Sequence, residues 1–100
     1  MHKMTKATAI PPKVKTTVWQ RDACKCVICG NVNAAPHCHF VRRSQLGLGI
    51  EENIWTGCEK CHREFDSEAT DGALHQIVEQ HLREWYPDWD KANLVYKKYN

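Results

Sequence analysis

Apolar positions along the first half of the chain predict one helix followed by two strands. Val14 and Val18 recur at helical spacing after a proline pair that suits a helix start, and this helix is expected to end near Asp22. Residues 37–42 alternate loosely between apolar and polar side chains, and residues 53–56 form a second short strand-like segment. The glycine-containing segment between them predicts a long loop that pairs the two strands as a hairpin.

The second half of the chain predicts helices. Residues 58–68 have the charged content of a short helix. A longer helix is expected to be capped by Asp71 and to end before Pro87, and a last short helix begins at about Asp90 and carries Leu94, Val95 and Tyr99 on one side. The apolar positions of the longer helix recur at helical spacing and predict a packed face: Leu74, Ile77, Val78, His81, Leu82 and Trp85.

These elements predict a single α+β domain over residues 11–100, with a C-terminal helical extension from about residue 71. Residues 1–10 show little apolar pattern and are expected to form a disordered tail. A chain of 100 residues buries only a small core, so an additional stabilising element such as a bound metal ion is expected. No apolar run approaches the roughly 20 residues of a membrane span, and no signal-peptide pattern is present, which favours a soluble cytoplasmic protein with reduced thiols.

Charge is distributed unevenly along the chain. Residues 1–50 contain eight Lys or Arg and one acid, Asp22, so that this half carries +7 while the whole chain carries +2 and the second half −5. A basic half is typical of a protein that binds a phosphate backbone. An ordinary solvated polar surface explains the charge equally well.

Two C-x-x-C pairs, Cys26 with Cys29 and Cys58 with Cys61, are separated by 28 residues. Each pair can direct two thiolates to one ion, and two pairs complete the tetrahedral shell of a structural zinc site. Disulfides or chance thiols are the less favoured alternatives, given the expected compartment. A shell of four sulfurs leaves no position for substrate, so this zinc would stabilise the fold rather than react.

A group of polar residues lies between the two cysteine pairs, with His62 directly after the second pair: His37, His39, Arg42, Arg43 and Asn53. Any one histidine of the group is more often a structural residue than a ligand, but their order is informative. His39, Asn53 and His62 occur within the segments CVICG, HFVRRS, GLGIEEN and CEKCH. This pattern, over about residues 21–66, resembles the HNH endonuclease family, especially its small zinc-bearing phage and prophage members.

The resemblance implies a ββα-metal, treble-clef-like core and a metal-dependent hydrolysis of DNA phosphodiester bonds. His39 would be the general base, Asn53 would pin the hairpin loop and orient that base, and His62 would bind a catalytic divalent cation. Arg42 and Arg43 would hold phosphates of the DNA, although they are also explained as an ordinary charged strand end. The resemblance also implies a bacterial host cell and phage packaging proteins such as a terminase as possible partners.

The chain departs from the family pattern at Cys38, where a second metal ligand, Asp or His, is usual. A thiolate is a poor ligand for magnesium, so either the ion is manganese, nickel or zinc, or Cys38 is a small buried residue and another side chain completes the shell. Asp66, one helical turn after His62, is preferred for that position over His37, which is expected to face solvent. The alternative function is a non-catalytic zinc-stabilised module that binds DNA or protein.

Overall fold

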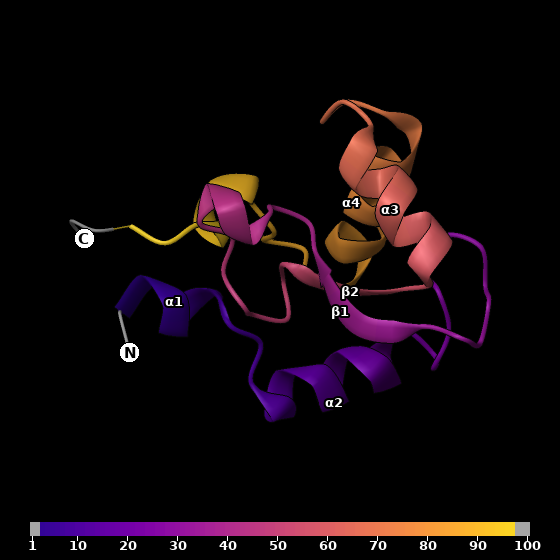
Figure 1. Ribbon diagram of the computed structural model, residues 1–100, viewed down its shortest axis with the longest axis horizontal. Helices are drawn as coiled ribbons and strands as arrows, with labels where there is room; N and C mark the ends of the chain where they lie inside the picture. The colour runs from indigo at the N-terminus through magenta and orange to yellow at the C-terminus, as the bar shows by residue number, and fades with distance from the viewer. Residues whose placement is uncertain (1–2, 98–100) are drawn as a thin grey trace.

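A two-stranded antiparallel sheet, β1 (Ala35–His39) and β2 (Ile54–Gly57), lies at the centre of the molecule (Figure 1). The computed structural model describes residues 3–97 and has an α+β fold. Within residues 3–97 the chain also forms four α-helices and two short 3₁₀ helices: α1 (Lys3–Thr8), α2 (Pro12–Arg21), η1 (Arg43–Gln45), α3 (Glu59–Ser67), α4 (Ala73–Trp85) and η2 (Lys91–Leu94).

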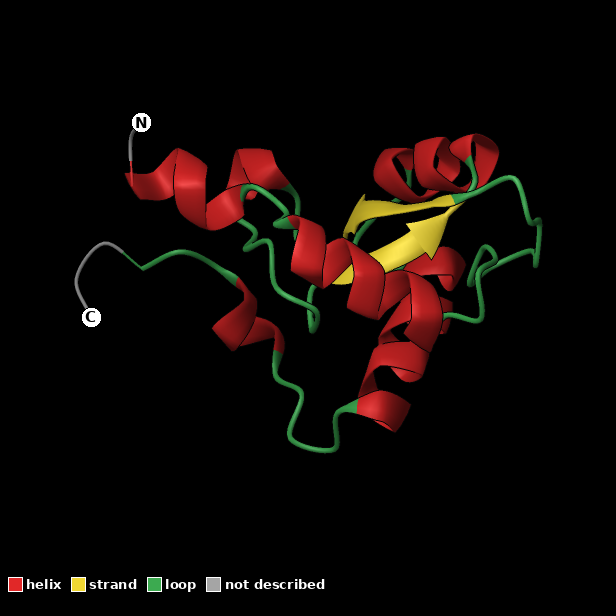
Figure 2. Cartoon of the chain, turned by 90° about the horizontal axis from the view of Figure 1, so that it is seen from below, coloured by secondary structure: helices red, strands yellow, loops and turns green. Residues whose placement is uncertain are grey.

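Both faces of the sheet are covered. Helix α2 lies against one side and α3 and α4 lie on the other, as Figures 1 and 2 show. Because successive strand residues point to opposite faces, all four residues of β2 are buried. The main core between the sheet and the helices contains Cys38, Phe40, Val41, Trp55, Phe65, Val78, Leu82, Trp89 and Leu94.

The expected order of strand, strand and helix agrees with the structure, but some boundaries differ. Strand β1 ends at His39 rather than at residue 42, because the backbone of Val41 bonds to the side chain of Asn53 instead of to β2. Asp71 does not cap α4, whose N-cap is Gly72. The carboxylate of Glu68 accepts the amide proton of His75 at 2.7 Å and so performs part of the capping role.

The C-terminal helix expected from about Asp90 is a single 3₁₀ turn, η2. Asp90 caps it by accepting the amide proton of Ala92, and Leu94 is buried in the core. Val95 then pairs with Gly47 in an isolated antiparallel bridge, so the chain is extended where a helix was expected. Tyr99 lies outside the described residues.

The N-terminal segment is not the disordered tail that the sequence predicted, within the residues that the structure describes. It forms α1, and Thr8 is buried. The amide of Gly49 donates to the carbonyl of Ala7 at 3.0 Å, and a Cβ atom at Gly49 would lie 1.9 Å from the carbonyl oxygen of Ala9. The glycine therefore allows the hairpin loop and the N-terminal segment to pack backbone against backbone.

A buried ion pair joins α2 to the second strand. The Arg21 guanidinium donates to both carboxylate oxygens of Asp22 and to the carbonyl of Ile54, while Asp22 accepts the amide proton of Thr56. His81, which we expected to pack as an apolar position, instead bonds to Asp22 at 2.7 Å. Burial alone would raise the pKa of Asp22, but the hydrogen bonds from His81 and Arg21 lower it to about 2.

None of the helices within residues 3–97 combines the length and the apolar content that crossing a bilayer requires.

Candidate metal centre and neighbouring pocket

The first cysteine pair lies on a tight turn between α2 and β1. Gly30 has a φ of 79°, a conformation that suits glycine, and its amide donates to the carbonyl of Cys26. The amide of Val27 donates to the carbonyl of Thr56, which attaches the turn to β2. Cys58 is the N-cap of α3, so the second pair lies on the first turn of that helix. The two pairs therefore meet beside the sheet.

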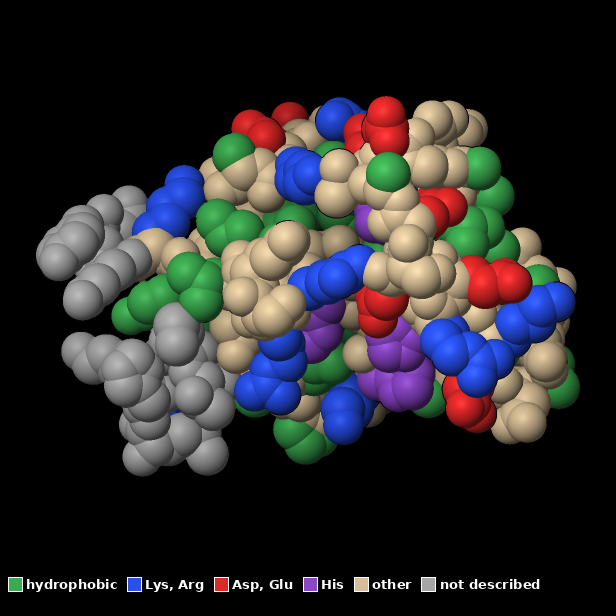
Figure 3. Space-filling view, turned by 45° about the horizontal axis from the view of Figure 1, so that its top comes forward, with side chains coloured by type: hydrophobic (Ala, Val, Ile, Leu, Met, Phe, Trp, Pro, Cys, Tyr) green, Lys and Arg blue, Asp and Glu red, His purple; other side chains and the backbone are tan. Residues whose placement is uncertain are grey.

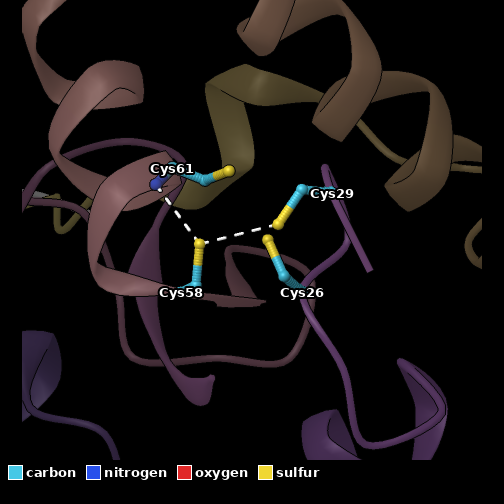
Figure 4. A group of neighbouring side chains, drawn as sticks. All are labelled: Cys26, Cys29, Cys58 and Cys61. Atoms are coloured by element: carbon cyan, nitrogen blue, oxygen red, sulfur yellow. Dashed lines mark hydrogen bonds between the residues drawn. The ribbon is translucent and has the colours of Figure 1, made fainter. Parts of the chain in front are cut away.

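The four sulfurs point toward one another (Figure 4) and all lie within 4.8 Å of each other. The sulfurs of Cys29 and Cys58 are 3.7 Å apart. A tetrahedral ion with metal–sulfur bonds of about 2.3 Å separates its sulfurs by about 3.8 Å. The geometry thus fits one tetrahedrally bound metal ion, as the C-x-x-C spacing predicted.

The pKa values of the thiols in this group are shifted in opposite directions. Burial opposes ionisation of Cys26, but hydrogen bonds from the surrounding backbone outweigh it and lower the pKa of this thiol to about 7. Burial and the neighbouring thiols raise the pKa of Cys61 above its ordinary value. A divalent cation would relieve the repulsion between the four thiolates, so this group could hold a structural metal ion.

A pocket of about 510 Å³ is lined in part by His62 and Asp66 of α3, the helix that also carries Cys61. Figure 3 shows histidine side chains at the surface, beside acidic side chains and with lysine and arginine side chains around them. The lining residues come from three separate segments of the chain, 10–15, 37–44 and 62–66: Ile10, Lys15, His37, His39, Arg42, Arg43, Ser44, His62 and Asp66. The fold thus brings candidate residues from separate motifs together in one pocket.

His39 lies at the end of β1 and is half-buried. Its Nε2 is 3.0 Å from the carbonyl oxygen of Thr8, which can only accept, so Nε2 carries the proton and Nδ1 of the neutral ring has a free lone pair. Burial lowers the pKa of His39, and the charge of Arg43 acts in the same direction, while the hydrogen bond to Thr8 opposes them. The imidazole is therefore held neutral and in one tautomer.

Asn53 immediately precedes β2 and is fully buried. Its Oδ1 accepts the amide proton of Val41 at 2.8 Å, and its Nδ2 donates to the carbonyls of Val41 and Leu48. These bonds tie the start of β2 to Val41 and Leu48 of the hairpin loop, the segment that the resemblance implied Asn53 would pin. No hydrogen bond joins the side chains of Asn53 and His39 among the described residues, and Asn53 bonds instead to the backbone of Val41, two residues after His39.

His62 and Asp66 lie one turn apart on α3. His62 Nε2 is 3.1 Å from Asp66 Oδ2, and Arg42 Nε is 3.9 Å from Asp66 Oδ1. The side chains of His62 and Asp66 are 32% and 40% exposed, so both are accessible from solvent. An imidazole and a carboxylate at this separation could bind one divalent cation together.

Cys38 and His37 are neighbours on β1 but differ in burial. Cys38 is fully buried among the core side chains, and burial raises the pKa of its thiol. His37 is exposed, as the sequence predicted, but its ring lies beside that of His62 with the centroids 5.0 Å apart. Arg42 and Arg43 both line the pocket, and Arg43 Nε donates to the hydroxyl of Thr8 at 3.3 Å.

Sequence reasoning did not identify the contribution of the N-terminal segment to this pocket. Thr8 and Ile10 carry no motif, and only the packing of α1 against the hairpin loop brings them beside His39. Lys15 was noted as a basic residue that could extend a DNA-binding surface, and it lines the pocket. For His37 a signal was available, because residues 37 and 39 share one face of a strand.

Comparison with protein-family models, with curated proteins and with solved structures finds no match to this chain.

Proposed function

We propose that this protein is a metal-dependent endonuclease of the HNH type that hydrolyses DNA phosphodiester bonds on a ββα-metal core. One observation carries the proposal: His39, His62 and Asp66, together with two arginines, line one pocket of about 510 Å³ although they come from different segments. Phosphodiester hydrolysis needs a base for the attacking water, stabilisation of the departing oxygen and positive charge around the phosphate. The pocket contains a candidate group for each need.

His39 is the proposed general base. Its hydrogen bond to the Thr8 carbonyl leaves Nδ1 as the proton acceptor, and its lowered pKa keeps that nitrogen unprotonated at neutral pH. Asn53 maintains the loop that follows β1 and so maintains the position of this ring. The N-terminal segment would also position this ring, through the hydrogen bond to the Thr8 carbonyl.

His62 and Asp66 are the proposed ligands of a catalytic divalent cation. Their donor atoms, 3.1 Å apart, fit the separation of two ligands on one ion. Such a cation would supply Lewis-acid stabilisation of the phosphate and of the departing oxygen. The four-cysteine group, with zinc as its proposed ion, would hold the first turn of α3 and therefore the position of His62.

Arg42, Arg43 and Lys15 would hold DNA phosphates at the pocket. These contacts address the backbone, so we propose modest sequence preference. The resemblance places such an enzyme in the cytoplasm of a bacterial host cell, encoded by a phage or prophage, with a terminase as a possible partner.

The test is nicking of supercoiled plasmid with magnesium, manganese, nickel or zinc ions. His39→Ala should abolish nicking and keep the zinc content and the unfolding midpoint. Arg42→Ala should weaken cleavage, whereas Arg63→Ala should not, because Arg63 is an exposed arginine of α3 that does not line the pocket. Undiminished cleavage by His39→Ala, purified free of host nucleases, would contradict the proposal.

The burial of Cys38 favours a second candidate function, a non-catalytic zinc-stabilised module that binds DNA or protein. Cys38 occupies the position of the usual second metal ligand and points into the core. A module of this kind would bind DNA without cutting it with any of the four ions. A nuclease should instead bind one divalent ion beyond the structural zinc and lose that ion in His62→Ala.

A further inference from the structure

The pocket contains a second histidine next to His62. His37 belongs to β1 and is exposed, and its ring centroid is 5.0 Å from that of His62. The donor nitrogens of the two rings lie within 4.8 Å of each other. We propose that His37, His62 and Asp66 together form a three-ligand site for a borderline transition-metal ion. This inference rests on the proposed function and names the ligand set of its cation.

A local irregularity of the sheet places His37 at this position. Ala35 pairs with Gly57 and Cys38 with Trp55, so β1 has one residue more than β2 between these two pairs. The extra residue is a bulge, which bends the strand and redirects nearby side chains. His37 lies within the bulged segment, beside α3, where its ring meets that of His62.

The neighbouring Cys38 is the rival ligand, because its sulfur also lies within 4.8 Å of the two ring nitrogens. Its surroundings are those of a core residue, however. The Cys38 side chain is fully buried in the core cluster that contains Trp55 and Phe65. Gly57 makes room for the Cys38 sulfur, because a Cβ atom at residue 57 would lie only 2.8 Å from it. An ion bound by this sulfur would have to enter the apolar core, which disfavours it.

His37 is free to turn toward an ion. Its imidazole makes no hydrogen bond or ion pair with any described residue, and it is exposed, so a change of rotamer breaks no polar contact. Asp66 already lies 3.1 Å from His62 Nε2, and its other oxygen faces Arg42 at 3.9 Å. Two of the three ligands are thus in place, and the third needs only a side-chain movement.

The donor set determines which ions the site prefers. Two imidazoles and one carboxylate leave positions open for water and for a phosphate oxygen, as in catalytic sites with three protein ligands. Imidazole suits zinc, nickel and cobalt, whereas magnesium prefers oxygen ligands. We therefore expect tighter binding of cobalt and nickel than of manganese, and binding of magnesium to be weakest.

The experiment is calorimetric titration of Co²⁺ into the full-length, zinc-loaded protein, with the visible absorption of cobalt as a second readout. Nitrogen and oxygen ligation gives weak bands, whereas replacement of the cysteine-bound zinc gives intense sulfur charge-transfer bands. Wild type should bind one cobalt with weak bands. His37→Ala should weaken this binding by more than the roughly 10- to 100-fold that loss of an outer-shell partner costs. Cys38→Ala should keep it, and zinc content and unfolding midpoints serve as the folding controls.

Two results would overturn the inference. The first is a cobalt affinity in His37→Ala equal to that of wild type. The second is loss of the cobalt site with weak absorption bands in Cys38→Ala, while His37→Ala retains that site. Plasmid nicking with the same preparations separates this inference from the proposed function. Nicking that survives in His37→Ala with unchanged cobalt affinity removes the inference and leaves the nuclease. A His37-dependent cobalt site in a wild-type protein that cuts no DNA supports the site and removes the nuclease.

Discussion

Replacement of Asn53 by alanine is expected to destabilise the fold strongly, because this buried carboxamide satisfies three backbone groups. They are the amide of Val41 and the carbonyls of Val41 and Leu48, at 2.8, 3.1 and 2.8 Å. Each buried polar group left unpaired costs about 1–3 kcal/mol. Taking the low end, since water can enter the space that is left, the three groups give a loss of about 3 kcal/mol. That is a large fraction of the stability of a small domain.

Urea unfolding at a fixed excess of zinc measures this loss. Asn93→Ala is the matched control, because Asn93 is exposed and its side chain bonds to no described residue, and it should change the free energy of unfolding by less than about 0.5 kcal/mol. Asn53→Asp keeps an acceptor for the Val41 amide but places a second acceptor against two carbonyls, so it should be as damaging as alanine at neutral pH.

A loss of no more than about 1 kcal/mol in Asn53→Ala, close to that of the control, would refute this reasoning. It would mean that the hairpin loop is held by its other contacts. The bond from the Leu48 amide to the Leu94 carbonyl, at 2.7 Å, is one of these.

Three further predictions concern the metal group, the buried ion pair and the base. Cys29→Ser should lose the structural ion and unfold at lower urea, whereas Cys24→Ser, outside the four-cysteine group, should retain one bound zinc by elemental analysis. Asp22→Asn should lower the free energy of unfolding by about 3 kcal/mol, because it leaves the buried Arg21 guanidinium without its carboxylate. Since the pKa of Asp22 is lowered from 3.8 to about 2, the difference in unfolding free energy between variant and wild type should shrink as the pH falls through that range. A difference that stays constant would contradict this prediction. DNA cleavage should persist at pH values below 6.5, the ordinary pKa of histidine, and fail only on further acidification, because the pKa of His39 is lowered and only the neutral ring accepts a proton. A cleavage rate that falls at or above pH 6.5 with saturating metal would contradict this prediction.

Local chemistry explains which features were predictable. The spacing within each C-x-x-C pair brings two sulfurs together whatever the rest of the chain does, and the four-cysteine group was therefore visible in the sequence. Helical periodicity likewise predicted that Val78 and Leu82 of α4 are buried, but Ile77 and Trp85, which were expected on the same packed face, are exposed. The i, i+4 spacing of His62 and Asp66 placed both on one side of α3, as the 3.1 Å contact bears out.

Features that depend on contacts between distant segments were decided only by the tertiary structure. Residues 3–10 have no pattern that predicts order, yet the hairpin loop pairs with Ala7, and Thr8 then meets His39, 31 residues later. His81 reads as an apolar position on α4 until packing brings it within 2.7 Å of Asp22. Propensity and spacing act over a few residues, whereas these contacts arise from how whole elements pack.

His37 and Cys38 show most clearly how the information in the sequence differs from that in the tertiary structure. From the sequence alone, His37 was expected to face solvent, whereas Cys38 was left open as a metal ligand or a small buried residue. The bulge between Ala35 and Cys38 and the core around Trp55 decide it, with the sulfur inside and the imidazole beside His62. The sequence determined the kinds of ligand present, and packing determined which of them meet, because a one-residue change of register moves a side chain to the opposite face.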